Sequence, residues 1–490
     1  MRVYAVDLGT TNTKVVLFDE RLRRLAIASA PTDLVRSGDR VELSAPDLLE
    51  TVLRLIRSCA SRASDAGDMD AGSHHAVIAL TGQAESLVLV DADGRDVRPA
   101  ISWLDDRASI EAAELGERFD AAEAFAITGE PTPSTTWPAA KLRWLARHEP
   151  DALERTERVL MLKDDLVRRL TGRALGERTT RGFTYLHDVL AGTPWSAMLD
   201  FVSISAEQLP TVVAAGADAG VVREAVAAAM PPAASWRVNV GALDHFCAMV
   251  GTGSYLPGVV SESAGTVLSL SMLAGDFAFD PAHSASFHAG IADGDVVLFS
   301  GVDGGGISLE WFRREGLAGM PYDELETALL ARGRRVRPSS APVFLPYLTG
   351  VAPPDLFASA RGAFLGLDLA HDRIDMAYAV QEGVAHILRR NVDAFGGARQ
   401  IVSTGGGTAS AHWNQLKADA CGVDLLVPDE EEATCRGAAV LALVEAGELA
   451  TLADADDLAL PTVTRYRPRD ASVHDERYRL FDDGLRRLFG

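Results

Sequence analysis

Two apolar runs, residues 3–6 and 15–18, stand on either side of a short polar segment at the start of the chain. The first run ends in Asp7, and the polar segment contains Gly9, Thr10, Thr11 and Asn12. This pattern predicts two strands joined as a hairpin with a small, polar tip.

A tip of this composition can bind phosphate. Gly9 allows a ligand to approach the backbone closely, and the hydroxyl, amide and backbone N–H groups beside it can donate hydrogen bonds to phosphate oxygens. Asp7 offers a hard oxygen ligand suited to Mg²⁺ next to those phosphates. An ordinary edge hairpin uses the same turn residues, so a purely structural turn remains an alternative.

Strand and helix patterns alternate through the rest of the first half. Ser44 and Asp47 form a capping pattern that predicts a helix to about Ala63. Further expected elements are strands at 76–81 and 87–90, and helices at 139–146, 162–170 and within the Ala-rich stretch 212–234.

The second half repeats the opening theme. Residues 259–271 again place a Ser/Gly/Thr tip between two strand-like runs, and 371–395 has helical spacing. A strand at 400–404 runs into three glycines, and the helix after them is closed by Gly422. Two similar hairpins indicate a duplicated architecture, with domains expected at 1–240 and 241–490.

Composition narrows the class of protein. A chain of 490 residues usually forms two domains. Its 69 acidic and 47 basic residues argue against a nucleic acid or an anionic membrane as partner. The four cysteines have no C-x-x-C spacing, which is typical of reduced thiols in a cytosol. There is neither a leader pattern nor a long apolar run, so we expect a cytoplasmic protein.

Four motifs together are more specific than any one of them. In chain order they are DLGTTNTK, GQAESLVLVDADGRDVRPAISWLDDR, GALDHFCAMVGTG followed by SESAGT, and STGGGTASAHWNQLKADACG. This series resembles the FGGY carbohydrate kinases, a branch of the actin, hexokinase and chaperone superfamily. The resemblance implies an α/β fold of two actin-like (ribonuclease H-like) domains, each a mixed five-stranded sheet flanked by helices, with a cleft for ATP and sugar between them.

The resemblance also implies a catalytic mechanism. Asp244 matches the family's general base, which takes the proton of the sugar hydroxyl, and Asp7 matches its Mg²⁺-associated aspartate. Because Asp244 begins an apolar helical run, a helix N-cap is the alternative role, and both roles can coexist.

ATP and Mg²⁺ are the cofactors that the resemblance implies. The residues it assigns to ATP are Thr10, Thr11, Asn12, Lys14, Gly265, Thr266, Gly306, Glu310, Gly406 and Ser410. A solvated strand lysine is the alternative for Lys14. Ser263 and Ala264 depart from the family's usual second phosphate loop, a small change because that loop acts through backbone amides.

The substrate is expected to be a small sugar or polyol. The residues that the resemblance places near it are Glu85, Ser86, Trp103, Asp106, Arg107 and His245. Carboxylates accept hydrogen bonds from hydroxyls, and an indole packs on the C–H face of a polyol. A solvated loop residue is the alternative for Glu85, and an ion pair with Asp105 or Asp106 is the alternative for Arg107.

The choice of sugar is less constrained by the motifs. Xylulokinase-like members have Met-His at the positions of Ala84 and Glu85, whereas glycerol kinases have Arg-Glu. A ketopentose such as xylulose is the substrate we expect, with a glycerol- or erythritol-type polyol kinase as the alternative. A non-kinase ATPase and a sugar sensor are further alternatives, against which Asp7 and Asp244 argue. The expected partners are the small-molecule substrate and, in a homodimer, a second copy of the chain.

Overall fold

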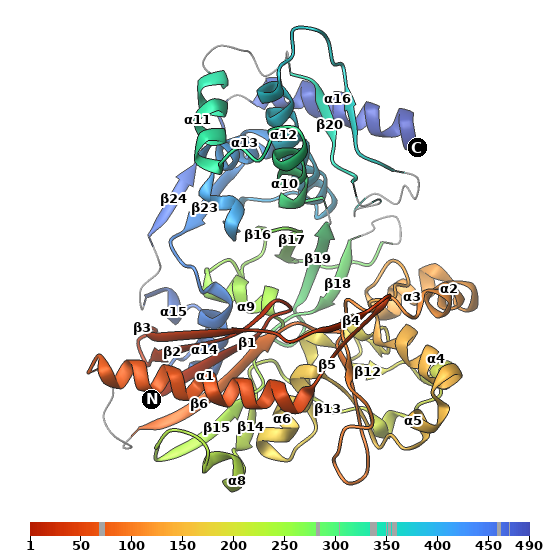
Figure 1. Cartoon of the computed structure of the whole chain (residues 1–490), viewed down its shortest axis with the longest axis vertical. Helices are drawn as coiled ribbons and strands as arrows, with labels where there is room; N and C mark the ends of the chain where they lie inside the picture. The colour runs from red at the N-terminus through yellow and green to blue at the C-terminus, as the bar shows by residue number, and fades with distance from the viewer. Residues whose placement is uncertain are drawn as a thin grey trace. The chain divides into compact units, whose positions relative to one another are not determined.

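The computed structural model describes residues 1–67, 74–280, 285–302, 304–333, 341–348, 350, 354, 360–457, 462–469 and 471–490. The chain forms two compact units (Figure 1). The first unit consists of Met1–Gly253, Phe287–Val297 and Glu432–Leu460, and the second consists of Ser254–Ser286, Leu298–Glu431 and Pro461–Gly490. A late segment, Glu432–Leu460, therefore belongs to the same unit as the N-terminal hairpin, although the domains predicted from the sequence divide the chain at 240.

A six-stranded mixed sheet forms the centre of the first unit, in the order β14-β15-β6-β1-β2-β3. These strands are β1 Arg2–Leu8, β2 Asn12–Asp19, β3 Arg24–Pro31, β6 His75–Gly82, β14 Asp218–Val221 and β15 Ser235–Asn239. β1 runs antiparallel to β2 and parallel to β6, so the predicted N-terminal hairpin is confirmed. In this register Asp7 lies opposite Lys14 on β2 and Thr81 on β6.

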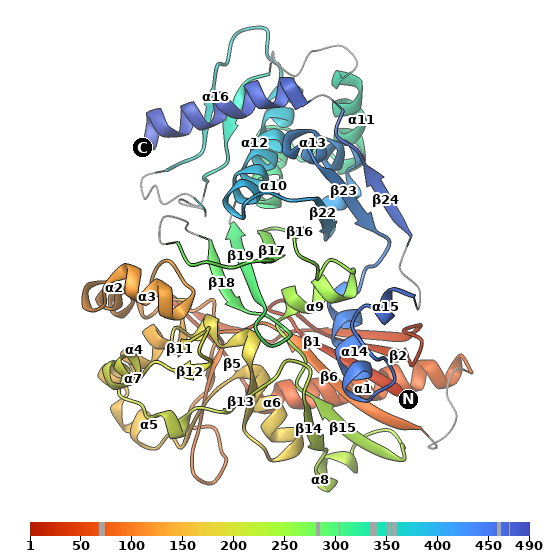
Figure 2. The same cartoon turned by 180° about the vertical axis from the view of Figure 1, so that it is seen from behind.

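Helices cover both faces of this sheet (Figures 1 and 2). α1 (Ala45–Asp65) packs on β2 and β3 and shares a core with Tyr4, Val6 and Leu8. Its N-cap is Ser44, whose side chain accepts from the amide of Asp47, as predicted. α14 (Ala433–Glu445) and α9 (Asp244–Gly251) lie on the opposite face, where α14 packs on β1 and β6.

Helices α9 and α14 cross at very close range because glycines stand at the crossing. A Cβ atom at Gly437 would lie 1.8 Å from the carbonyl oxygen of Cys247, and one at Gly251 would lie 1.9 Å from that of Ala433. No larger residue fits at either position without moving a backbone. The close crossing fixes the start of α9 relative to the sheet.

The first unit also contains a five-stranded sheet, in the order β4-β5-β8-β7-β9. Its strands are β4 Val35–Ser37, β5 Arg40–Leu43, β7 Leu87–Val90, β8 Ala100–Ile101 and β9 Arg158–Met161. The helices around it include α2 Ser109–Arg118, α3 Ala121–Thr128, α4 Pro138–His148, α5 Pro150–Glu154, α6 Leu162–Thr171 and α7 Ser196–Val202. The strands predicted at 76–81 and 87–90 and the helices predicted at 139–146 and 162–170 are thus confirmed.

The Ala-rich stretch 212–234 is mostly not helical, so that prediction was wrong. It contains β14, most of β13 (Thr211–Val213) and only one short helix, α8 (Glu224–Ala227). Gly216 and Gly220 have φ values of 72° and 109°, which interrupt a helix, and hydrogen bonding to β15 favours the extended form. With β14 included, this sheet has six strands and not the expected five.

The second unit contains strands of a seven-stranded sheet with the order β18-β19-β17-β16-β22-β23-β24, again more than the five expected. The strands are β16 Val259–Ala264, β17 Leu268–Leu273, β18 Ser286–Ala289, β19 Val296–Val302, β22 Gln400–Thr404, β23 Asp424–Pro428 and β24 Val463–Tyr466. The helices of the second unit include α10 Gly306–Glu315, α11 Tyr322–Gly333, α12 Arg373–Ala394, α13 Ala411–Cys421 and α16 Ala471–Phe489. The predicted hairpin at 259–271, the long helix and the helix closed by Gly422 are confirmed. No helix in the described ranges is both long enough and apolar enough to cross a membrane.

Candidate active site

The tip of the β1–β2 hairpin is polar and open to solvent. Thr11 and Asn12 are exposed, and Thr10 is half-buried. A Cβ at Gly9 would lie 2.6 Å from the carbonyl oxygen of Asn12, so this tight tip requires glycine. Thr10 Oγ1 accepts a 2.8 Å hydrogen bond from Trp103 Nε1, which joins the predicted phosphate loop to a predicted sugar-binding residue.

Asp7 stands at the end of β1 on the sheet face that α14 covers. Lys14 lies opposite it on the same face and donates a 2.6 Å hydrogen bond to Glu432, the residue before α14. Burial raises the pKa of Asp7 to about 7, with the charge of Asp244 contributing to that rise and the charge of Lys14 opposing it. Burial alone would lower the pKa of Lys14, but its hydrogen bond and ion pair with Glu432 raise it overall.

Asp244 is the first residue of α9. The N-cap position belongs to Leu243, whose side chain makes no capping hydrogen bond, while Asp244 Oδ1 accepts a 2.7 Å hydrogen bond from the amide of His245. The imidazole Nε2 of His245 lies 3.9 Å from the same oxygen. With 31% of its side chain exposed, the Asp244 carboxylate retains accepting capacity for a ligand.

A buried network holds the start of α9. The amide of Leu243 donates to Thr179 Oγ1 at 2.9 Å, and Thr179 donates to Glu177 at 2.7 Å. Glu177 also accepts a 2.9 Å hydrogen bond from Lys163, forming an ion pair that is almost fully buried. These contacts orient Asp244 from the backbone side.

Glu85 stands on the loop between β6 and β7 with φ at 64°, a left-handed conformation that is unfavourable for a residue other than glycine. Its side chain is half-buried and has no hydrogen bond or ion pair within the described part of the chain. Burial raises the pKa of Glu85 to about 8, with Asp244 adding to the rise and Lys141 opposing it. Backbone strain combined with an unpartnered carboxyl is typical of a functional position.

Lys141 is a residue of this region that the sequence did not identify. It lies on α4, is fully buried, and donates one hydrogen bond to the carbonyl of Thr136 at 2.8 Å. Burial lowers the pKa of Lys141 to about 8, while the charge of Glu85 opposes that change. The signal available in the sequence was a lone lysine within the apolar positions of a predicted helix.

Ser86 and Trp103 are linked to each other. Ser86 Oγ donates to Gln83 Oε1 at 2.6 Å and accepts from the amide of Trp103 at 3.2 Å. Ser86 itself is fully buried, whereas Trp103 is half-buried. The two residues therefore form a connected support beside Glu85.

Arg107 is engaged in buried ion pairs. It donates to Asp105 through Nε and Nη2, both at 2.7 Å, and to Glu42 at 2.6 Å. The ion pair with Asp105 was the structural alternative raised from the sequence. Asp106 is exposed and accepts a 2.7 Å hydrogen bond from Thr135. Sugar binding by Arg107, Asp106 and His245 stays a prediction.

In the second unit, two predicted ATP-binding segments lie together. The amide of Gly306 donates to the carbonyl of Gly265 at 3.0 Å, and the amide of Ile307 donates to that of Thr266 at 3.1 Å. A Cβ at Gly306 would lie 2.5 Å from the Gly265 oxygen, so the contact depends on glycine. The exposed Thr266 stands at the tip of the β16–β17 hairpin.

Glu310 lies one turn into α10, and its carboxylate is hydrogen-bonded to neighbouring side chains. Arg313 binds its carboxylate through two hydrogen bonds of 2.7 and 2.8 Å, and Tyr322 donates a third at 2.7 Å. The Arg313 hydrogen bonds lower the pKa of Glu310 to about 2, with Tyr322 contributing. Contact between Glu310 and a nucleotide stays a prediction.

The glycine-rich turn before α13 carries Gly406 and Ser410. Ser410 is the N-cap of α13, since its Oγ accepts from the amide of Trp413 at 3.1 Å. The same hydroxyl donates to Glu326 of α11, which also accepts from the amide of His412 at 2.8 Å. Glu326 was not identified from the sequence, because nothing in the spacing of α11 connects it to this turn.

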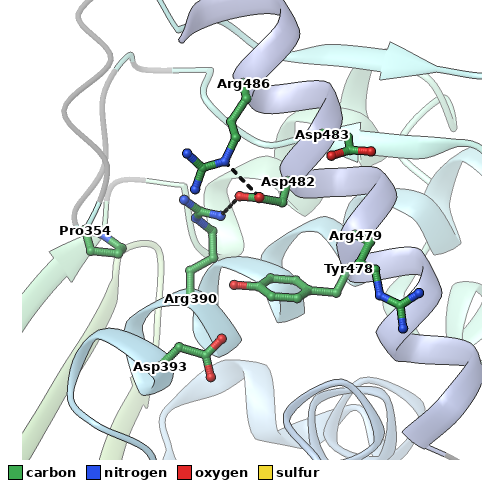
Figure 3. Close-up of a pocket in the computed structure, with 8 residues that line it drawn as sticks. All are labelled: Pro354, Arg390, Asp393, Tyr478, Arg479, Asp482, Asp483 and Arg486. Atoms are coloured by element: carbon green, nitrogen blue, oxygen red, sulfur yellow. Dashed lines mark hydrogen bonds and ion pairs between the residues drawn. The ribbon is translucent and has the colours of Figure 1, made fainter.

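A pocket of about 390 Å³ lies in the second unit (Figure 3). Its lining consists of Pro354, Arg390, Asp393, Tyr478, Arg479, Asp482, Asp483 and Arg486. Arg390 and Arg486 both bind Asp482, the latter at 2.9 Å. None of the residues predicted to bind ATP or sugar lines this pocket.

Within the described ranges, no three His, Cys, Asp or Glu side chains gather in a way that could hold a metal ion by themselves. Mg²⁺ commonly uses only one or two carboxylates together with water and phosphate oxygens. Asp7 fits a site of this kind, in which one protein carboxylate binds the ion together with water and phosphate oxygens. The negative charge of Asp244 disfavours the ionised form of Asp7, and a bound cation would offset that repulsion.

Comparisons with known proteins identify a family for both halves of the chain. Residues 2–251 match the N-terminal domain of the FGGY family of carbohydrate kinases, and residues 262–446 match its C-terminal domain. The xylulose kinase of Escherichia coli (strain K12) is 30% identical over 431 residues, which cover 86% of this chain and 85% of the relative. The xylulose kinase of Bacillus subtilis (strain 168) is 25% identical over 98% of this chain and 95% of its own. A crystal structure of a xyloylose kinase from Brucella ovis has a TM-score of 0.90 at 28% identity, covering 100% of this chain and 99% of that one.

The predicted α/β class with two domains and mixed sheets is confirmed.

Proposed function

Because this chain belongs to the FGGY family of carbohydrate kinases, we propose that it transfers the γ-phosphoryl group of ATP to a hydroxyl of a ketopentose, xylulose in the first place. Sugar kinases of this family use ATP as the phosphate donor. The named activity of the two curated relatives supports xylulose as the acceptor. A cytoplasmic location and a homodimer remain predictions of the sequence.

The observation that carries the proposal is the group of carboxyl side chains in the first unit. Asp244 interacts electrostatically with both Asp7 and Glu85, although the three come from different elements. Burial of like charges is costly unless a cation or hydrogen-bond donors compensate for them. A polyhydroxy substrate and a divalent cation supply those two kinds of compensation.

Asp244 is the proposed general base. The network of Thr179, Glu177 and Lys163 orients the first turn of α9, and the partly exposed carboxylate of Asp244 can accept the proton of a sugar hydroxyl. Little base strength is required, because phosphoryl transfer has a loose transition state in which the proton leaves late.

Asp7 is the proposed residue for Mg²⁺. When bound, the ion would supply positive charge to the phosphate oxygens and would offset the charges of Asp7 and Asp244. In the second unit, the tip with Gly265 and Thr266 beside Gly306 is proposed to bind phosphate. The turn of Gly406 and Ser410 is proposed to bind adenosine.

Glu85 and Trp103 are the proposed sugar contacts. The Glu85 carboxylate can accept hydrogen bonds from two neighbouring hydroxyls, and the half-buried indole of Trp103 can pack on carbon-bound hydrogens of the same substrate. Thr10 fixes the indole through its 2.8 Å hydrogen bond. Sugar position is thus coupled to the phosphate tip.

The test is an ADP-release screen with Mg-ATP across ketopentoses, ketohexoses, pentitols, tetritols and glycerol, with Asp244→Asn as the inactive control. We expect the highest kcat/KM with xylulose. A higher value with glycerol or erythritol would support the polyol kinase alternative. ADP release that no acceptor accelerates would indicate a non-kinase ATPase, and sugar binding without turnover would indicate a sensor.

A further inference from the structure

Trp103 and Thr10 are joined by a hydrogen bond between two segments that are far apart in the sequence. Trp103 Nε1 lies 2.8 Å from Thr10 Oγ1, and both side chains are half-buried. An indole N–H can only donate, so the Thr10 oxygen accepts this hydrogen bond. The Thr10 hydroxyl makes no other hydrogen bond within the described ranges, so its own proton is left for a further acceptor.

A phosphate oxygen is an acceptor that suits this proton. Ionised phosphate oxygens accept hydrogen bonds, and a hydrogen bond to a charged acceptor is stronger than one between neutral groups. A freely rotating hydroxyl presents a phosphate with either its proton or a lone pair, and the lone pair repels the anion. The indole N–H occupies a lone pair of Thr10 and thereby favours the orientation that attracts phosphate.

The backbone of Trp103 is itself held by the loop that follows β6. Its amide donates to Ser86 Oγ at 3.2 Å, and Ser86 Oγ donates to Gln83 Oε1 at 2.6 Å. The amide of Gln83 in turn donates to the carbonyl of Leu8, the last residue of β1, at 3.1 Å. Ser86 and Gln83 are both buried. The chain of hydrogen bonds therefore starts at β1 and returns through the indole to Thr10, two residues further along the same hairpin.

Thr32 holds the backbone of the tip but leaves the Thr10 hydroxyl alone. The Thr32 hydroxyl donates to the carbonyl of Gly9 at 2.9 Å, and its amide donates to the carbonyl of Thr11 at 2.9 Å. These two contacts fix the residues on either side of Thr10, and neither involves the Thr10 side chain. The orientation of that hydroxyl is set by Trp103 and not by the turn itself.

We propose that Trp103 is a positioning residue for ATP as well as a sugar contact, because its indole N–H orients the Thr10 hydroxyl toward phosphate and so lets a bound sugar strengthen ATP binding. This inference rests on the proposed function, in that it takes Trp103 as a sugar contact and Thr10 as a phosphate contact. A sugar packed on the indole restricts its rotation, so ATP binding no longer has to order the pair. The coupling is reciprocal, and ATP strengthens sugar binding by the same factor.

The test measures by calorimetry how xylulose changes the affinity for adenylyl imidodiphosphate, a non-hydrolysable ATP analogue, with Mg²⁺. In the wild type we expect saturating xylulose to tighten binding of the analogue about fivefold or more, as is usual for coupled sites. Trp103→Phe keeps an aromatic face for the sugar but has no N–H, so this factor should fall to about one. Affinity for xylulose without nucleotide should change less than about twofold, because the ring face remains.

Substitution of Thr10 tests the same hydrogen bond from its other end. Thr10→Val removes the hydroxyl at nearly constant volume and should lose both affinity for the analogue and the coupling, whereas Thr10→Ser should keep them. In the Thr10→Val background, Trp103→Phe should have no further effect on analogue binding, because both changes act through one hydrogen bond. Thr10 stands at an open tip, so its variants serve if thermal denaturation shows Trp103→Phe to be poorly folded.

The matched control is Trp137→Phe. Trp137 is also half-buried, and its Nε1 donates to the carbonyl of Thr132 at 3.1 Å, with neither residue among those predicted to bind a ligand. Loss of that N–H should leave the coupling unchanged. Coupling of wild-type strength in Trp103→Phe, or an equal loss in Trp137→Phe, would overturn the proposal and leave the Trp103 N–H a structural contact.

Failure of this inference and failure of the proposed function give different results. If the ADP-release screen identifies another acceptor, the binding experiment uses that acceptor, and the expected coupling is the same. If no acceptor increases ADP release in the wild type, the proposed function fails. A wild type that phosphorylates its sugar but shows no coupling between sugar and analogue would contradict this inference alone.

Discussion

Lys14 Nζ donates a 2.6 Å hydrogen bond to Glu432 Oε2, joining the N-terminal hairpin to the start of α14 across 418 positions of sequence. The Glu432 side chain is 9% exposed and that of Lys14 is 30% exposed, so the pair is largely shielded from water. The lysine is therefore neither a freely solvated strand residue nor an uncommitted phosphate ligand. An incoming phosphate would compete with Glu432 for the same ammonium.

Lys14 has two candidate roles, a structural ion pair with Glu432 and binding of an ATP phosphate, and substitution of either partner should separate them. Lys14→Met removes the ion pair from a largely buried carboxylate and should lower stability by about 1–3 kcal/mol, while raising KM for ATP. Glu432→Gln keeps the ammonium and removes its competitor, so KM for ATP should be unchanged or lower. Thermal denaturation and initial rates measure both effects. Equal increases in KM for ATP in the two variants would show that Lys14 serves structure only.

Asp244→Asn should remove phosphorylation of every sugar while nucleotide binding is retained. Loss of a general base typically costs roughly 10² to 10⁴ in rate. Asparagine can still accept the hydrogen bond from the amide of His245, so α9 should remain intact. Rates from coupled ADP release and ADP affinity from calorimetry give the two quantities. Turnover close to wild type would remove Asp244 from the mechanism and leave only its place in the helix.

The close crossing of α9 and α14 predicts a large effect of one methyl group. In Gly437→Ala the new Cβ would lie 1.8 Å from the carbonyl oxygen of Cys247, and the expected loss is about 3 kcal/mol or more. Because α9 carries Asp244, kcat should fall along with stability.

Gly116→Ala in α2 is the matched control for this effect. Gly116 is exposed, and its Cβ would meet only Pro133, at 3.5 Å. An alanine there should be neutral or should stabilise by about 0.5–1 kcal/mol, since glycine is unfavourable inside a helix. Chemical denaturation of both variants compares them directly. Similar stabilities for the two would contradict the steric argument.

The elements that the sequence predicted well are those marked by clear local signals. The hairpin of β1 and β2 has two apolar runs around a polar tip, α1 has its Ser44 cap, and α12 has apolar residues at helical spacing. The stretch 212–234 failed because alanine favours helices locally, whereas the hydrogen bonds between β14 and β15 decide its conformation. Local propensity was overruled there by pairing with residues more than ten positions away.

Only part of the candidate site could be predicted, because the sequence shows local motifs but not contacts between distant segments. Asp7 and Asp244 stand in motifs that are contiguous in sequence, so their chemistry could be recognised there. Lys141 and Glu326 lie on helices whose relation to those motifs exists only in three dimensions. The ion pair of Arg107 with Glu42 and Asp105 likewise joins separate segments, which left its role undecided from sequence.

Glu85→Gln should stabilise the protein at alkaline pH. The pKa of Glu85 is raised to about 8 by burial, so the folded protein binds this proton more tightly than the unfolded chain. Its contribution to stability is complete below about pH 4.5 and is lost as pH rises toward 8. Glutamine carries no such loss. The variant should match wild type at pH 4.5 and exceed it by roughly 1–3 kcal/mol at pH 8.5, a figure reduced for partial solvent exposure.

Denaturant titrations at the two pH values measure this difference, and Glu85→Gly separates charge from backbone strain. Glycine also relieves the left-handed φ of 64°, so it should add a gain of about 1 kcal/mol that does not depend on pH. The glutamine variant keeps that strain, and its gain should appear only at the higher pH. A gain of equal size at both pH values would mean that strain or packing, and not the buried charge, sets the stability cost at this position. In that case Glu85 would not be the ionising group that sugar binding is proposed to use.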